Sequence, residues 1–127
     1  MPIDFLYLDE LVAIHLDQIG RYGGQAGIRD VGLLESAAAQ PRAMVAGEFL
    51  HRDLFEMAAA YLFHVVKNHP FIDGNKRTGA AAAIVFLALN RVDVEADQAG
   101  LEIVTLAVAR GDADKKAVAE FLRKIAR

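Results

Sequence analysis

The stretch that decides the fold is HPFIDGNKRTG, residues 69–79. It combines an imidazole, a carboxylate, a carboxamide, two cations and two glycines, and predominantly apolar segments flank it at residues 57–66 and 79–89. Polar groups cost free energy when they are buried without partners. A dense polar segment between two core segments therefore indicates a functional site that the rest of the chain is built to hold.

The composition favours a small globular protein, and the length predicts a single domain over residues 1–127. A hydrophobic content of 54% indicates several helices buried on more than one face, or a surface partly covered by a partner. Cysteine is absent, which excludes disulfides and thiolate metal sites. Neither a secretory signal nor an apolar run of the roughly 20 residues that cross a bilayer is visible, so we expect a cytoplasmic protein. A net charge of −3 argues against direct nucleic-acid binding.

Periodicity, caps and breakers predict an all-α fold of six helices with at most a small hairpin. Asp30, Asp53 and Asp73 are predicted N-caps, and Pro70 should end the helix before it at His69. Residues 42–52 are ambiguous between an irregular hairpin and an ordered loop. The predicted helices cover about residues 9–21, 30–41, 53–68, 74–90 and 98–109, and a last helix follows residue 111. The third and fourth should form a buried central pair that crosses closely, because both carry alanine runs.

The residues after Pro70 have the chemistry of a phosphate site. A helix N-terminus carries unpaired N–H groups and partial positive charge, and it binds anions readily. Gly74 lets a ligand approach the backbone, and Asn75 is expected to add a side-chain donor. Lys76 and Arg77 add two cations, of which the arginine fork suits phosphate oxygens.

Two further residues complete a possible catalytic set. Asp73 is an acid beside these cations, and an acid next to a phosphate implies Mg²⁺ if a nucleotide binds. His69 precedes the turn and can act as the general base for an incoming hydroxyl. Singly, these residues have ordinary explanations as caps, turn residues and solvated charges. Together they fit phosphoryl or nucleotidyl transfer better.

The stretch also resembles the signature of the Fic/Doc family, His-x-Phe-x-(Asp/Glu)-(Gly/Ala)-Asn-x-Arg, which residues 69–77 match. Residues 21–24 (RYGG) and 53–56 (DLFE) resemble its Doc (death-on-curing) branch. The resemblance implies the compact helical Fic fold, in which Phe71 anchors the loop. It also implies His69 as general base and Asp73 as the Mg²⁺ ligand. Phosphates would be held by Gly74, Asn75, Lys76 and Arg77, with Arg21 facing the site.

Two positions bear on the activity that the resemblance implies. Fic adenylyltransferases usually have glycine where this chain has Lys76 and a second arginine where it has Ala80, and Doc proteins share both changes. The resemblance therefore implies a toxin that transfers the γ-phosphate of ATP to a threonine of translation elongation factor Tu and arrests translation. Its activity would be silenced by a Phd-like antitoxin whose C-terminal segment folds onto it. A Fic-type protein adenylyltransferase and a non-catalytic partner- or nucleotide-binding module remain alternatives.

Other candidate motifs in the chain are weaker. Residues 51–54 (HRDL) spell the start of a protein-kinase catalytic loop, but the asparagine that should follow is Ala58 and no glycine-rich nucleotide loop is present. His15 is expected to be structural, and the spacing of His64 and His69 does not suit a two-histidine metal site on one helix face. By family likeness, residues 42–52 occupy the place of a flap that docks the target protein.

Overall fold

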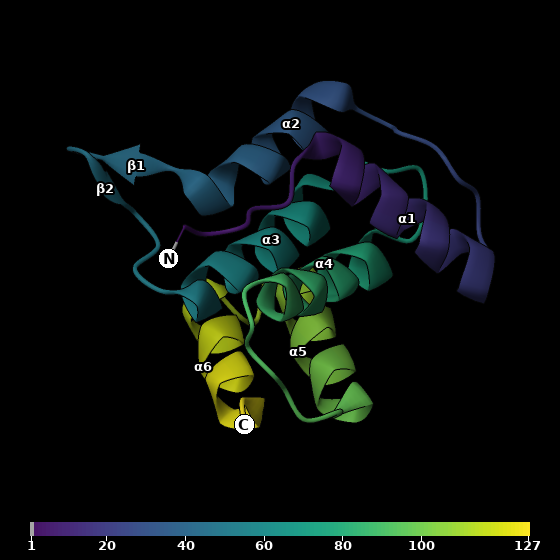
Figure 1. The fold of residues 1–127 in the computed structure, drawn as a ribbon. Coiled ribbons are helices and arrows are strands. Elements are labelled where there is room, and N and C mark those ends of the chain that lie inside the picture. The colour runs from purple at the N-terminus through teal and green to yellow at the C-terminus, as the bar shows by residue number, and fades with distance from the viewer. Residues whose placement is uncertain (1) are drawn as a thin grey trace.

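The computed structural model describes residues 2–127, which form six α-helices and one two-stranded antiparallel hairpin (Figure 1). The predicted all-α fold with a small hairpin is confirmed. A 3-10 turn, η1 (Gln40–Arg42), leads from the second helix into the hairpin strands β1 (Met44–Val45) and β2 (Glu48–Phe49). The helices are α1 (Leu8–Tyr22), α2 (Val31–Ala39), α3 (Leu54–Asn68), α4 (Asn75–Leu89), α5 (Gln98–Arg110) and α6 (Lys115–Ile125). None of these helices is long and apolar enough to span a membrane.

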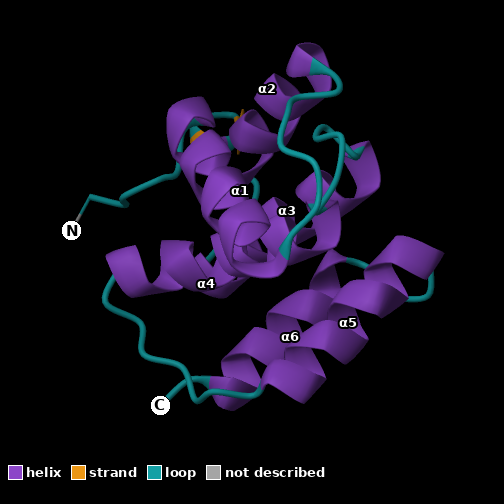
Figure 2. Cartoon of the chain, turned by 90° about the vertical axis from the view of Figure 1, so that its right-hand side faces the viewer, coloured by secondary structure: helices purple, strands orange, loops and turns teal. Residues whose placement is uncertain are grey.

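Helix α3 forms the centre of the molecule, in contact with α2, α4, α5, α6 and η1. Figure 2 shows α5 and α6 side by side on one side of the α3–α4 pair, with α1 and α2 on the other. The alanines of residues 58–60 are fully buried, as the predicted central position requires. The hydroxyl of buried Tyr61 donates to the Leu6 carbonyl at 2.9 Å and accepts from the Leu6 N–H at 2.7 Å. This pair of bonds fixes the N-terminal segment on the core.

The predicted close crossing of α3 and α4 is confirmed at Gly79, where α4 lies close to the backbone of α3. A Cβ atom at Gly79 would lie 3.0 Å from the Leu62 carbonyl oxygen and 3.1 Å from Cγ2 of Val66. A side chain there would push apart the two helices that flank the polar stretch. The glycine therefore sets the spacing of the pair and, with it, the position of the loop between them.

Aspartates cap most of the helices, because a carboxylate can accept from the free N–H three residues onward. Asp30 accepts from the Leu33 N–H and Asp53 from the Glu56 N–H, which confirms both predicted caps. The prediction that Asp73 caps α4 is wrong. The N-cap is Gly74, whose φ of +72° places it in the left-handed region, and it provides no side-chain cap.

Helix α6 is held against α3 by a cluster of three side chains, Lys115, His51 and His64. The Lys115 ammonium lies 3.3 Å from Nε2 of His51 and 3.2 Å from Nε2 of His64. Burial, together with the neighbouring Lys115 charge, lowers the pKa of His64 to about 4. At neutral pH the imidazoles are therefore uncharged acceptors for the lysine.

Candidate functional site

The segment between α3 and α4 is braced by the loop that follows α1. Ile28 and Phe71 form an antiparallel bridge. The Ile72 N–H donates to the Gly27 carbonyl at 2.9 Å, and the N–H groups of Arg29 and Asp30 both donate to the Pro70 carbonyl. Two loops far apart in sequence thus hold each other in register, and the polar stretch has a fixed backbone.

Phe71 anchors this segment in the core, as the family resemblance implied. Its side chain is fully buried and stacks on the imidazole of His15, with ring centroids 4.0 Å apart. Nε2 of His15 accepts from the Gly27 N–H at 3.3 Å, and Nδ1 lies 3.4 Å from the Thr78 hydroxyl. Burial lowers the pKa of His15, which keeps the ring neutral and able to accept. His15 is therefore a structural residue, as expected.

Asn75 is also structural, and here the structure corrects the sequence analysis. Its side chain is 4% exposed. Its amide oxygen accepts from the Phe71 N–H at 2.9 Å, and its amide nitrogen donates to the Phe71 carbonyl at 3.0 Å. The expected side-chain donor to phosphate is therefore already used inside the protein. The side chain is turned into the protein, and the backbone N–H of Asn75 is one of the free donors at the start of α4.

Asp73 projects into solvent at the turn. Its carboxylate accepts from the Gln25 N–H at 3.2 Å and from the Gly74 N–H at 2.8 Å. These two bonds, with the nearby Arg77 charge, hold the pKa of Asp73 below its usual range, so the group is ionised at neutral pH. A Cβ atom on Gly24 would lie 2.7 Å from one of its oxygens, which explains the glycine at that position.

The two predicted cations at the start of α4, Arg77 and Lys76, differ in the contacts that they make. The Arg77 guanidinium donates to the Gly23 carbonyl at 2.9 Å and lies over the Tyr22 ring at 5.7 Å. Lys76 is exposed, and within residues 2–127 its ammonium has no hydrogen-bond or ion-pair partner. With the free N–H groups of the first helical turn, these side chains give this end of α4 a positive charge that suits an anion.

His69 occupies the other end of the turn. It ends α3 in the left-handed conformation with φ +52°, and its side chain is exposed. Within the described residues its imidazole makes no hydrogen bond, so both ring nitrogens are open to a substrate. Arg21, by contrast, is not brought to these residues by any contact. Its guanidinium pairs with Asp17 at 3.0 Å and its side chain is 66% exposed.

Comparison with known proteins gives the family of the chain. The model of the Fic/DOC family matches residues 5–87. The chain belongs to the Fic/Doc family. A protein named protein kinase doc from Escherichia phage P1 is 39% identical to it over 117 residues, which cover 92% of this chain and 91% of the phage protein. A protein named toxin Doc from Mycolicibacterium smegmatis is 43% identical over 91 residues, 72% of this chain and 69% of that protein. The predicted family is confirmed.

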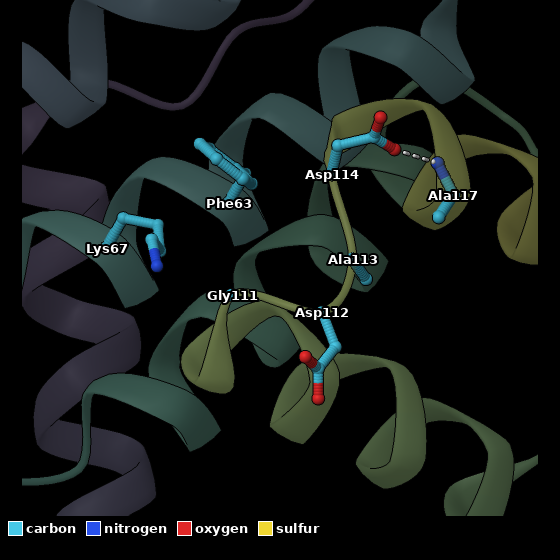
Figure 3. Close-up of a pocket in the computed structure, with 7 residues that line it drawn as sticks. All are labelled: Phe63, Lys67, Gly111, Asp112, Ala113, Asp114 and Ala117. Atoms are coloured by element: carbon cyan, nitrogen blue, oxygen red, sulfur yellow. Dashed lines mark hydrogen bonds between the residues drawn. The ribbon is translucent and has the colours of Figure 1, made fainter.

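A groove of about 550 Å³ adjoins the positive end of α4 in this Fic/Doc protein. Lys76, Arg77 and Tyr22 line it together with Ala80, and the rest of its wall is mainly apolar side chains of α4 and α5. A second hollow of about 440 Å³ lies between α3 and the α5–α6 loop (Figure 3). Phe63, Lys67 and Asp112 border it, and it contains none of the predicted site residues.

The donor set at Asp73 suits magnesium better than a metal held by protein ligands alone. Among residues 2–127 no three His, Cys, Asp or Glu side chains are grouped so that they could hold a metal ion. Mg²⁺ in phosphate-transfer sites is commonly bound by one or two carboxylates, substrate phosphates and water. One ionised, exposed carboxylate beside an anion site fits that pattern.

Sequence reasoning missed the residues of the loop after α1. Residues 21–24 entered the sequence analysis only through their resemblance to the Doc branch, yet the Gly23 carbonyl accepts from Arg77 and the Gln25 N–H donates to Asp73. The cluster of glycines was the available signal. It indicated a loop but not the distant residues that pack against it.

Proposed function

We propose that this chain is the toxin of a toxin–antitoxin system and acts as an ATP-dependent protein kinase. In this proposal it transfers the γ-phosphate of ATP to a threonine hydroxyl of elongation factor Tu, which arrests translation in the cytoplasm. The observation that carries the proposal is the N-terminus of α4. There an ionised, exposed Asp73 and a Lys76 without a side-chain partner among residues 2–127 flank free N–H groups. The printed names of the two relatives, a protein kinase and a toxin, support it.

Each site residue has a separate role in the proposed reaction. His69, whose ring nitrogens make no bond within residues 2–127, takes the proton of the attacking threonine hydroxyl. The threonine oxygen then bonds to the γ-phosphorus as the bond from that phosphorus to the β–γ bridging oxygen breaks, and ADP leaves. Lys76 and the N–H groups of the first turn of α4 hold the phosphate oxygens and stabilise the charge that develops during transfer. Arg77 adds its positive charge from a position fixed by the Gly23 carbonyl. Asp73 would hold Mg²⁺, which, when bound, neutralises charge on the phosphates.

Protein adenylylation is the competing activity, because the same residues could serve a nucleotide bound in the reverse direction. Ala80 borders the groove beside Lys76 and Arg77 and offers no donor there. Arginine at that position would add a bidentate phosphate contact. The absence of a guanidinium at residue 80 supports γ-phosphate transfer over AMP transfer.

We further propose that a Phd-like antitoxin silences the toxin by laying its C-terminal segment into the groove beside α4. Apolar side chains such as Val85 and Leu106 remain 37% exposed there, and Lys76 and Arg77 give one end of the groove positive charge. A segment with apolar anchors and an acidic end would complement both features. The β1–β2 hairpin, which exposes Met44 and Val45, is the proposed docking flap for the target protein.

The direct test uses ATP labelled on either the α- or the γ-phosphate. The purified protein is incubated with elongation factor Tu, Mg²⁺ and each label, beside a His69→Ala variant. We expect only the γ label on elongation factor Tu, and a rate about 10²- to 10⁴-fold lower in the variant. Transfer of the α label alone would establish adenylylation instead. Nucleotide binding without transfer of either label would favour the non-catalytic module.

A further inference from the structure

Arg29 holds the backbone on both sides of His69. Its Nε donates to the His69 carbonyl at 2.7 Å, and one terminal nitrogen donates to the Asn68 carbonyl at 3.1 Å. The backbone N–H of Arg29 donates to the Pro70 carbonyl at 2.7 Å. One residue of the loop after α1 therefore contacts three consecutive carbonyl groups where α3 ends.

This contact matters because His69 is in a conformation that a residue with a side chain seldom adopts. Its φ of +52° is left-handed, where the Cβ atom crowds the backbone. Such conformations persist when the surroundings fix them. The last carbonyls of a helix also carry partial negative charge, which an arginine at that end complements. The planar guanidinium fork holds two acceptors in a fixed geometry, whereas a lysine ammonium is a compact charge on a flexible stem without that fork.

We infer that Arg29 is a positioning residue for His69: it locks the left-handed turn that presents the imidazole to the substrate hydroxyl. The inference rests on the proposed function insofar as His69 is the general base. The side-chain bonds that Arg29 makes among residues 2–127 go to the end of α3 and not to α4, so it should affect the proton-transfer step and leave nucleotide binding unchanged.

The test compares Arg29→Met and Arg29→Lys with Arg110→Met. Arg110 is a matched control because it is also an exposed arginine near the end of a helix, paired only with Asp112. For Arg29→Met we expect kcat for γ-phosphate transfer to fall about ten-fold, the size expected for lost bonds to a charged group, with KM for ATP unchanged. Arg29→Lys should recover part of the loss, because it restores the charge without the fork. Arg110→Met should match the wild type.

A second readout does not depend on activity. Amide hydrogen exchange at His69 should become about ten-fold faster in Arg29→Met, because its N–H bond to the Val65 carbonyl closes the same turn. Unchanged exchange at His69, or unchanged kcat in a folded variant, would overturn the inference. If the wild type transfers no label, the proposed function fails. In that case the hydrogen-exchange result still tests whether Arg29 holds the turn at His69. Faster exchange at His69 in Arg29→Met supports this role, and equal exchange overturns it.

Discussion

The side-chain amide of Asn75 is buried, and its substitution distinguishes a structural role from a phosphate-binding role. In Asn75→Ala, the N–H and the carbonyl of Phe71 both lose their partners, at 2.9 and 3.0 Å, while Phe71 stays fully buried. Leaving a buried polar group unsatisfied costs about 1–3 kcal/mol. Two such groups predict a loss of about 2–6 kcal/mol in the free energy of unfolding, a large part of the stability of a small domain.

The assay is urea denaturation followed by circular dichroism, with the free energy of unfolding taken from the midpoint and slope. The matched control is Asn68→Ala, which removes a single bond, to the Leu33 carbonyl at 3.0 Å, and should cost about 1 kcal/mol. A loss below about 1 kcal/mol in Asn75→Ala, together with weaker ATP binding, would refute the structural role. That result would restore Asn75 as a side-chain donor to phosphate.

Three further predictions concern packing, metal binding and pH. Gly79→Ala should lower the free energy of unfolding by about 1–3 kcal/mol, measured by denaturation, because the new Cβ would crowd α3. Gly24→Ala should reduce Mg²⁺-dependent transfer about 10- to 100-fold, because its Cβ would displace the Asp73 carboxylate. The free energy of unfolding should fall by about 1–2 kcal/mol, after allowance for solvent screening, as the pH drops from 6.5 to about 4. Burial lowers the pKa of His64 in the folded protein, so in this pH range the unfolded chain binds more protons than the folded one.

Each of these predictions has a control in the same chain. Gly20→Ala, in α1 with nothing within 4 Å of the new Cβ, should raise stability by up to about 1 kcal/mol, and equal losses at both glycines would contradict the packing argument. Gly111→Ala carries similar backbone strain, at φ +82°, without a neighbour within 4 Å, so it should leave transfer unchanged. His64→Gln should flatten the stability profile between pH 6.5 and 4, and an unchanged profile would assign the pH dependence to other groups.

The features that were predicted correctly from the sequence depend on residues that are close together in the chain. Asp30 and Asp53 bond to N–H groups three residues away, so the pattern around each aspartate was enough to identify it as a cap. Pro70 ended α3 for the same reason, since a proline restricts the residue before it. The family signature located the candidate site, because its residues lie within one short segment.

The errors came from contacts that the sequence does not display. Asp73 looks like a helix cap, yet its carboxylate accepts from Gln25, which lies 48 residues earlier in the chain. Asn75 looks like a ligand donor, but its side chain bonds to the backbone of Phe71, which is buried against His15, a residue of α1. Arg29 carried no pattern of its own, because its role depends on where α3 ends in space.

The most direct test of the account is the mass of elongation factor Tu after reaction with the protein, ATP and Mg²⁺. Intact-mass spectrometry followed by peptide mapping reads the group transferred and the residue that receives it. The account predicts an increase by one phosphoryl group on a threonine, absent when Asp73→Asn replaces the wild-type toxin. An increase by one AMP would contradict the kinase assignment, and an unmodified elongation factor Tu would contradict the proposed target.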